Sequence, residues 1–348
     1  MTDSNPPHRR RERYRGTHPR RFEQKYKELD PELDPATVEK VLLSGKTPAG
    51  QHRPILVDEI LERLTPSPTA RGADVTLGYG GHAEAILKRL GPDGRLLALD
   101  VDARQLPLTE ARLRGLGFGD DRLIVRRSNY AGLASILPAI GWQEGVDFLL
   151  ADLGLSSMQI DNPSRGFSYR HRGPLDMRLN PQAGPTARQW LAGTSTERIA
   201  EALAAGGDEP RAERIAEAIV ASRGTRPLET THHLRRIIEA ALPEVLDEDE
   251  SSRTVTRVFQ AVRIAVNDEF GALDQFLRML PYCLRPGARV AILSFHSGED
   301  GRVKRHFREG RNAGLYSEIA EQLIRPSAEE KRANLRSSAA RLRWAIRG

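Results

Sequence analysis

The chain has 348 residues, of which 39% are hydrophobic and 29% are charged, and its formal net charge is +6. This length and apolar content suffice for a globular protein with a substantial core, and they exclude a disordered tether. Because no apolar run of about 18 residues occurs and the start of the chain is polar, the sequence argues against a membrane span and a secretory signal and predicts a cytoplasmic protein.

The single cysteine and the uneven distribution of charge further narrow the possible classes of protein. Cys283 has no partner for an intrachain disulfide and lies among apolar residues, which predicts a packing role. Residues 1–28 hold nine Lys and Arg against four acids, and residues 325–348 hold seven against two. Two basic ends suit phosphate contacts, although a solubilising tail is an equally good interpretation of residues 1–28.

The first 50 residues are polar, proline-rich and charged, which predicts a basic, flexible extension outside the fold. After an amphipathic helical pattern over residues 54–64, short apolar strands alternate with turns and helices. The predicted strands are Ala73–Leu77, Arg95–Leu99, Arg122–Val125, Val146–Ala151 and Ala288–Ser294. This alternation is typical of an α/β protein with a parallel sheet covered on both faces.

The fourth and fifth predicted strands are about 135 residues apart, too far for one crossover connection. Helical patterns recur in this interval, at Arg188–Ala192, Glu197–Ala205, Arg211–Ser222, Thr231–Leu242 and Thr254–Leu280. We therefore predict a core in two parts, residues 51–160 and 269–348, the second ending in a basic segment. Residues 161–268 form a helical insert that binds the substrate.

A glycine-rich turn follows the first strand and leads into a helix, with the sequence DVTLGYGGH over residues 74–82. Glycines allow positive φ and close approach of a ligand, and a helix N-terminus offers free N–H groups. Gly78, Gly80 and Ala83 also satisfy the dinucleotide fingerprint, and Asp100 ends the second strand where an acid can bind ribose hydroxyls. NAD and S-adenosylmethionine are both candidate cofactors at this point.

The fourth strand ends at Asp152, at the sheet edge where α/β proteins bind ligands. A carboxylate there is costly to bury without a partner, which favours a functional role. A short polar motif at this strand end is typical of amino-methyltransferases. Acceptors that bind the N–H hydrogens of an exocyclic amine help its nitrogen become a nucleophile, a task for positioning and electrostatics without a metal.

With these features together, the chain resembles the ribosomal RNA small-subunit methyltransferase H family, whose members methylate the exocyclic N4 of a cytidine in the decoding region of 16S rRNA. The resemblance spans residues 52–345. Its motifs are HRPIL from His52, DVTLGYGGH from Asp74, DLGLSSMQIDNPSRGFSYRHRGPLDMR from Asp152, DEPRAERIAEAIV from Asp208, RVFQAVRIAVNDE from Arg257, SFHSGED from Ser294 and a closing LRSSAARLR.

The resemblance implies a class I (Rossmann-like) methyltransferase sheet with an inserted all-helical domain and S-adenosylmethionine as cofactor. The residues that it places around the cofactor are Gly80, Gly81, His82, Asp100, Tyr130, Asp152 and Gln159. We assign catalysis to Asp152 together with Ser156 and Ser157. Four positions depart from the family pattern, namely Tyr79, Met158, Gly298 and Gly301.

A segment rich in aromatic rings, arginines and glycines follows the catalytic strand, and it could form the wall that a flipped-out base needs. An ordered linker is the alternative interpretation. The candidate RNA contacts are Phe167, Tyr169, Arg170, His171 and Arg178, with His296 at the end of the fifth strand. The His296 region lacks a hydrolase elbow and a strong metal pattern, so we predict no metal.

The sequence thus predicts an enzyme that acts on 16S rRNA, within the small ribosomal subunit, and no membrane partner. An NAD-dependent oxidoreductase and a non-catalytic RNA-binding assembly factor are the two alternatives. Whether the chain forms a homodimer, and whether free or assembled RNA is its substrate, are left open.

Overall fold

The computed structural model describes residues 54–224, 227–243 and 247–348. The predicted N-terminal extension, residues 1–50, lies outside the described residues. Pro54 to Gly348 group into one compact unit. No helix in the described ranges combines the length and the apolar character that a membrane span requires.

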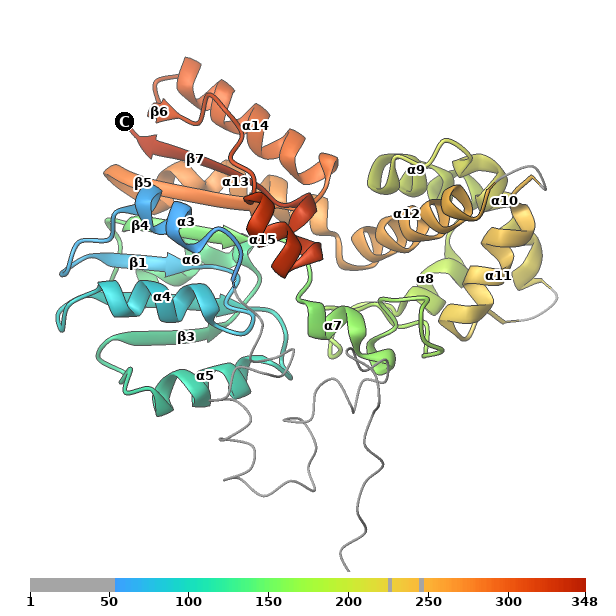
Figure 1. Cartoon of the computed structure of the whole chain (residues 1–348), viewed down its shortest axis with the longest axis horizontal. Coiled ribbons are helices and arrows are strands. Elements are labelled where there is room, and N and C mark those ends of the chain that lie inside the picture. The colour runs from blue at the N-terminus through green and yellow to red at the C-terminus, as the bar shows by residue number, and fades with distance from the viewer. Residues whose placement is uncertain (1–53, 225–226, 244–246) are drawn as a thin grey trace, which may run out of the picture. The chain divides into compact units, whose positions relative to one another are not determined.

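The described chain contains one seven-stranded sheet, in the order β3-β2-β1-β4-β5-β7-β6 (Figure 1). Its strands are β1 (Arg71–Asp74), β2 (Arg95–Asp100), β3 (Leu123–Arg127), β4 (Val146–Asp152), β5 (Leu284–Ser294), β6 (Tyr316–Ile319) and β7 (Arg341–Arg347). β1 to β5 are mutually parallel, and β7 runs antiparallel to both β5 and β6. This mixed sheet is typical of class I methyltransferases and, with the helices inserted after β4, confirms the predicted fold class.

Helices cover both faces of the sheet because consecutive strand residues point to opposite sides. In β4, Leu149 and Ala151 join one buried cluster, whereas Phe148 and Leu150 join the other. The first cluster lies under α6 (Leu133–Ala139), α13 (Glu269–Cys283) and α14 (Ser297–Asn312). The second lies under α3 (Val57–Leu64), α4 (Gly81–Arg89) and α5 (Leu106–Gly115). The nearly uninterrupted apolar runs of the central strands follow from this double burial.

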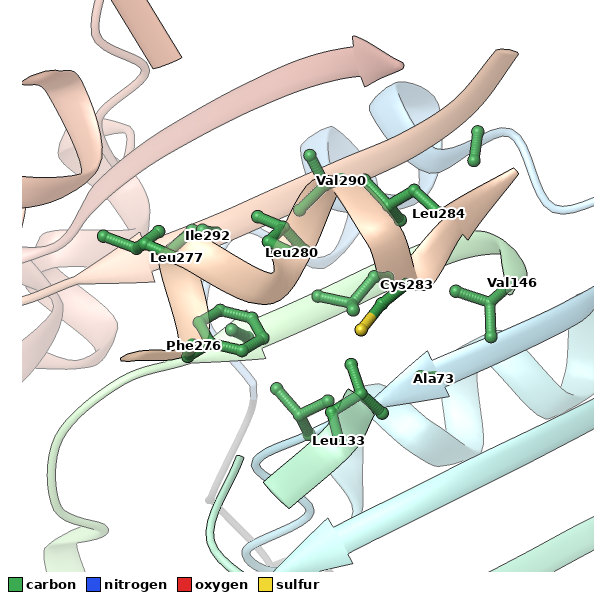
Figure 2. Close-up of a cluster of buried hydrophobic side chains, with 14 of the residues drawn as sticks. Ala73, Leu133, Val146, Phe276, Leu277, Leu280, Cys283, Leu284, Val290 and Ile292 are labelled. Carbon is green, nitrogen blue, oxygen red and sulfur yellow. The ribbon is translucent and has the colours of Figure 1, made fainter. Parts of the chain in front are cut away.

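Cys283 is a packing residue, as predicted. It is 2% exposed and lies among Phe276, Leu280 and Leu284, with Leu133 of α6 nearby (Figure 2). Burial in these apolar surroundings raises the pKa of its thiol to about 11, which disfavours a reactive thiolate.

Between β4 and α13, the described residues form helices, irregular chain and an isolated β-bridge between Pro174 and Thr230. The helices of this interval are α7 (Ser157–Asp161), α8 (Ala187–Gly193), α9 (Thr196–Gly207), α10 (Ala212–Arg223), α11 (Thr231–Ala241) and α12 (Glu248–Asn267), and it contains the short 3-10 turn η3 (Pro163–Arg165). Two further 3-10 turns lie outside this interval, η2 (Tyr130–Gly132) before β4 and η4 (Leu335–Ala339) after α15. α8 to α12 share a buried apolar cluster that is separate from the two clusters against the sheet. The exact division of residues 51–348 into domains stays a prediction.

One predicted helix is wrong as drawn. The run Thr254–Leu280 is two helices, because Asp268 adopts a left-handed conformation with φ of 48° and ends α12. Aspartate tolerates this conformation better than most residues. Apolar periodicity continues on both sides of the break, so the pattern could not reveal it.

The basic C-terminal segment is also more structured than its charge suggested. It contains α15 (Ala328–Ala333) and β7, whose Arg343 pairs with Asp300 at 2.6 Å. Arg347 donates to the carbonyls of Pro281 and Leu315. These arginines hold the sheet together, so counting charges overstated the basic surface available for RNA.

Candidate active site

Three acidic residues end adjacent strands at one edge of the sheet. Because β1 lies between β2 and β4, Asp74, Asp100 and Asp152 are neighbours at the carboxyl ends of these strands. The chain after β1 contacts both flanking strands: Thr76 Oγ1 accepts a 2.6 Å hydrogen bond from Asp152 N, and Gly78 N donates to Asp100 Oδ2 at 2.7 Å. The glycine turn and the two flanking acids therefore meet in one place.

The glycine turn is held by α5. Gly78 and Gly80 have φ of 50° and 73°, values that L side chains rarely adopt. Thr109 Oγ1 donates to Gly78 O at 2.6 Å and Arg112 Nη2 to Tyr79 O at 2.7 Å. A Cβ at Gly80 would lie 2.9 Å from Thr109 Cγ2. α4 begins directly after this turn without a side-chain cap, so the N–H groups of its first turn can receive a polar ligand.

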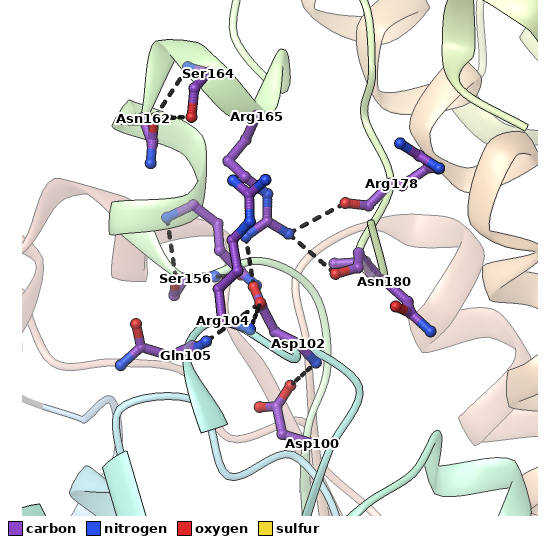
Figure 3. Close-up of polar contacts among 12 residues, drawn as sticks. Asp100, Asp102, Arg104, Gln105, Ser156, Asn162, Ser164, Arg165, Arg178 and Asn180 are labelled. Carbon is purple, nitrogen blue, oxygen red and sulfur yellow. Dashed lines mark hydrogen bonds and ion pairs between the residues drawn. The ribbon is translucent and has the colours of Figure 1, made fainter. Parts of the chain in front are cut away.

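Asp100 organises the turn through both of its oxygens. Oδ2 accepts from Gly78 N, and Oδ1 accepts from Asp102 N at 2.8 Å (Figure 3). Burial raises the pKa of this carboxyl, although the two backbone donors act in the opposite direction. Each carboxylate oxygen has a second lone pair, so Asp100 can accept from ribose hydroxyls while it holds the turn.

Asp102 is a buried residue of this edge that the sequence analysis did not assign. It is 1% exposed, and its Oδ2 accepts from Arg165 Nη1 at 2.6 Å and from Gln159 Nε2 at 2.8 Å. Burial alone would raise the pKa of Asp102, but Arg165 and Gln159 outweigh it and the pKa is lowered. Its only sequence signal was its position two residues after a strand-ending acid.

Polar side chains of α4 and β4 also lie close together at this edge. His82 Nε2 lies 3.6 Å from Asp152 Oδ2, which is too long for a hydrogen bond. Among the described residues, neither His82 Nε2 nor Asp152 Oδ1 has a hydrogen-bond partner, although both atoms are buried. Buried polar atoms are normally satisfied, so this pair of atoms is suited to bind a ligand.

Asp74, which the sequence analysis did not assign, interacts electrostatically with both residues of this pair. It is 1% exposed, and its Oδ1 accepts from Thr76 N at 3.1 Å. Burial raises the pKa of Asp74 to about 6, with Asp152 and Asp100 acting in the same direction and His82 against them. The edge therefore concentrates negative charge that a positively charged ligand would offset.

Ser156 and Gln159 form a capping box at the start of α7. Ser156 Oγ accepts from Gln159 N at 3.2 Å, and Gln159 Oε1 accepts from Ser156 N at 2.9 Å. Ser157 is the first residue of the helix. A hydrogen bond with Ser156 helps to hold Tyr79, whose hydroxyl pKa is raised by burial. Ser156 thus has a structural duty beside the catalytic one predicted for it.

Tyr130 follows β3 and lies at the same edge as Asp100. Its ring meets Phe276 edge-on at 5.4 Å, and its hydroxyl donates to Glu269 O at 3.4 Å. Burial raises the pKa of this hydroxyl, with Glu269 acting in the same direction. The ring is consequently fixed in orientation, as an aromatic wall beside a nucleoside would need to be.

The aromatic candidates for RNA contact are packed into the insert. Phe167 is 8% exposed and has the Arg165 guanidinium 5.4 Å from its ring. Tyr169 packs edge-on against Phe259 at 5.4 Å, and its hydroxyl lies 3.0 Å from Thr256 Oγ1 on α12. These contacts give both rings a role in holding the segment.

The polar candidates for RNA contact differ in how free their side chains are to bind a ligand. Arg170 is exposed, whereas Arg178 forms a bidentate pair with Asp176 at 2.8 and 2.9 Å. His171 is partly exposed, and its carbonyl accepts from Thr231 Oγ1 at 2.9 Å. Arg170 is the candidate with the most freedom to meet phosphate.

His296 lies at the end of β5 and caps α14. Its Nδ1 accepts from Glu299 N at 3.4 Å, and its Nε2 is 3.3 Å from Glu299 Oε1. Burial would raise the pKa of Glu299, but His296 outweighs it and the pKa is lowered. The neighbouring Gly298 is closely packed, because a Cβ there would lie 2.6 Å from Phe270 Cζ. At this departure from the family pattern, the Phe270 ring therefore occupies the space that a larger side chain would need.

Two of the remaining departures are buried or partly buried. Met158 is 4% exposed within α7, Tyr79 is partly buried, and a Cβ at Gly301 would meet open space. No group of three or more metal-ligating side chains occurs in the part of the chain that the structure describes.

Comparisons with known proteins agree with this geometry. The model of the MraW methylase family matches residues 49–347. Ribosomal RNA small subunit methyltransferase H 1 of Lachnoclostridium phytofermentans is 47% identical, over 98% of this chain and 94% of its own. Ribosomal RNA small subunit methyltransferase H 2 of Alkaliphilus metalliredigens is 48% identical, over 97% of each.

A solved structure described as a putative rRNA-methylase from Clostridium thermocellum aligns with 84% of this chain and 95% of its own, at 11% identity and a TM-score of 0.39, too weak a likeness to argue from. The family match and the long, nearly half-identical alignments decide the assignment. This chain belongs to the MraW methylase family and is an S-adenosylmethionine-dependent methyltransferase.

Proposed function

We propose that this enzyme methylates the exocyclic N4 of a cytidine in the decoding region of 16S rRNA, within the small ribosomal subunit. Relatives that align over nearly the whole chain are named small-subunit rRNA methyltransferases. The site supports an amino group as the acceptor of the methyl group. Because ribosomal subunits are assembled in the cytoplasm, the proposal places the enzyme there; it includes no homodimer.

The residues at the sheet edge fit the cofactor. Gly81 and the first turn of α4 offer backbone N–H groups, whereas Gly80 N donates to Leu77 O at 2.7 Å and its lack of a side chain leaves room for a ligand to approach. Asp100 retains lone pairs for ribose hydroxyls. The acidic residues offset the positive charge of a sulfonium. When bound there, S-adenosylmethionine supplies an activated methyl group.

Asp152 is suited to prepare the nucleophile. The lone pair of an exocyclic amine is delocalised into the ring, and an acceptor of its N–H hydrogens concentrates electron density on the nitrogen. Asp152 Oδ1 is such an acceptor, because it is buried and has no partner among the described residues. A preorganised acceptor costs no reorganisation during the reaction.

This unpartnered carboxylate oxygen is the observation that carries the proposal. Asp152 N is fixed by Thr76, so the side chain projects from a rigid strand end. His82 Nε2 lies beside it and can contact the cofactor or accept the proton that the amine loses. Ser156 and Ser157, predicted as catalytic, begin the helix next to this position.

RNA contact is proposed for the irregular chain after α7 and for the helical insert. Arg170 and Arg172 are exposed there, and the rings of Phe167 and Tyr169 hold the segment from within. Exposed arginines supply affinity through phosphate, while base selection requires contacts nearer to the reacting amine.

The test is incubation of the protein with a labelled methyl donor and undermethylated small subunits, followed by mass-spectrometric mapping of the modified nucleoside. We expect one N4-methylated cytidine in the decoding region. Label at another atom would refute the assigned position, and binding without label would favour the assembly-factor alternative. Calorimetric titration with NAD and with S-adenosylhomocysteine tests the oxidoreductase alternative, which predicts heat only with NAD.

A further inference from the structure

The irregular chain over residues 162–186, here called the joining segment, leads from the catalytic strand into the helical insert. Its Arg165 is 6% exposed although it carries a charge. The guanidinium donates to Asp102 Oδ2 at 2.6 Å, to Arg178 O at 3.1 Å and to Leu179 O at 3.0 Å (Figure 3). One buried side chain therefore binds a residue of the cofactor edge and two backbone carbonyls of the joining segment.

On the cofactor side, these contacts reach the turn after β2. Asp102 N donates to Asp100 Oδ1 at 2.8 Å, and Asp102 Oδ2 also accepts from Gln159 Nε2. A ligand that orders Asp100 also orders the backbone of Asp102, and through it the partner of Arg165. The chain of contacts from Asp100 to Arg165 consists of direct hydrogen bonds.

On the RNA side, the joining segment is folded tightly upon itself. A Cβ at Gly166 would lie 2.2 Å from Pro174 O, and one at Gly173 would lie 1.8 Å from Pro163 O. Met177 N donates to Arg165 O at 3.0 Å. Such close backbone approaches make residues 163–179 move as one piece, so a shift of Arg165 carries the proposed RNA-contacting residues with it.

The same piece is bound to the end of α12 by a side-chain amide. Asn267, the last residue of α12, donates through Nδ2 to Met177 O and accepts at Oδ1 from Leu179 N, each at 2.7 Å. The backbone that Arg165 binds is therefore also the backbone that positions α12. The contacts run without interruption from the cofactor edge into the helical insert.

We propose that Arg165 is a positioning residue that couples the cofactor site to the RNA-binding segment, so that each ligand strengthens the binding of the other. The inference rests on the proposed function for the identity of the RNA. Coupling of this kind is reciprocal and has a measurable size, typically about 5- to 150-fold in affinity.

The chemistry of arginine explains why lysine could not replace it. Its planar guanidinium has five N–H donors and can bind a carboxylate and two carbonyls together, whereas an ammonium is a compact charge. We expect Arg165→Lys to keep the ion pair with Asp102 and to lose the contacts with the two carbonyls. The variant should fold, because Asp102 is not left as an unpaired buried charge.

The experiment measures the affinity of the full-length protein for small ribosomal subunits with and without saturating S-adenosylhomocysteine. We expect the cofactor product to raise the affinity of the wild type by about tenfold, and that of Arg165→Lys by less than about twofold. If Arg165→Lys does not fold, the double variant Arg165→Met with Asp102→Asn removes both charges and should show the same loss. A purely structural role would lower stability and leave the ratio of affinities unchanged.

A matched control is Arg336→Lys, because Arg336 Nη2 pairs with Asp161 at 2.6 Å just before the joining segment but does not contact Asp102. Arg336→Lys should keep the wild-type ratio between the affinities for small subunits measured with and without S-adenosylhomocysteine. Absence of coupling in the wild type, wild-type coupling in the Arg165 variants, or an equal loss in the control would each overturn the proposal. Methyl incorporation by the wild type is measured separately, so failure of the proposed function remains distinguishable.

Discussion

The sheet edge and the joining segment present their functional groups in opposite ways. At the edge, Asp100 and Asp152 are fixed at strand ends by hydrogen bonds with the glycine turn. Asp152 Oδ1 is buried and has no hydrogen-bond partner among the described residues. In the joining segment, Arg170 is exposed whereas Phe167 is packed inside. Backbone geometry therefore places the groups at the edge, whereas the arginine proposed to contact RNA lies exposed at the surface.

This difference has an energetic consequence. A buried polar group that loses its partner costs free energy, because water cannot replace the partner. An exposed arginine exchanges a phosphate for water and ions at little cost. Substitutions at the edge should therefore have large and specific effects, whereas those at exposed arginines should be small and sensitive to salt.

The largest effect is expected for Asp152→Ala. Loss of a preorganised acceptor should lower kcat by about 10²- to 10³-fold and also weaken cofactor binding. Steady-state kinetics with small subunits measure the first effect and calorimetry the second. Asp152→Asn, which retains one acceptor oxygen, should recover part of the rate. Kinetics like those of the wild type in Asp152→Ala would remove this residue from the reaction.

The second-largest effect is expected for Asp74, whose contribution to stability depends on pH. Its pKa is raised by burial to about 6 in the folded protein, above its ordinary value of 3.8, so the folded state holds this proton more tightly than the unfolded state does. The free energy of unfolding should then fall as pH rises from about 4 to 6, by up to about 3 kcal/mol. Asp74→Asn should lack this component.

Urea unfolding of the wild type and of Asp74→Asn between pH 4 and pH 8 measures this pH-dependent part of the free energy of unfolding. The variant should match the wild type near pH 4 and be the more stable of the two above pH 6. A difference in stability that does not change with pH would show that Asp74 is not the titrating group.

A smaller effect is expected for Asp100→Ala. The N–H groups of Gly78 and Asp102 would lose their acceptor, which should cost about 1–3 kcal/mol. We expect the Kd for S-adenosylhomocysteine to rise by about 10- to 100-fold, with kcat little changed at saturating cofactor. Asp100→Asn is the matched variant. If kcat falls while the Kd stays constant, the residue acts on the reaction itself.

The smallest effect is expected for Arg170→Ala. Removing one phosphate contact should weaken binding to small subunits a few-fold and reduce the slope of log affinity against log salt by about one. Cofactor binding should not change. Arg89→Ala is a suitable control, because Arg89 is also exposed but lies at the opposite end of α4 from the glycine turn. Equal effects in both variants would remove the distinction between the joining segment and the general surface.

Local sequence patterns were sufficient for the five parallel strands and their carboxyl edge, but they missed β6 and the antiparallel β7. The apolar runs of β2 and β4 predicted their own burial, and both strands end at the acids that the sequence analysis singled out, Asp100 and Asp152. The glycine turn could be recognised because positive φ and a helix start impose a strict order of residues. These features depend on neighbours in the chain, which is why sequence reveals them.

The tertiary structure decided which charged residues meet. Asp102 and Arg165 are 63 positions apart and form a buried pair, yet Arg165 looks like any other arginine of its segment. β7 escaped notice because three of its residues are arginines, although Arg343 is itself buried. Only the partners Asp300, Pro281 and Leu315 explain Arg343 and Arg347. The sequence shows the hydrophobic periodicity of each helix and strand, whereas the pairing of distant charged residues depends on how those elements pack.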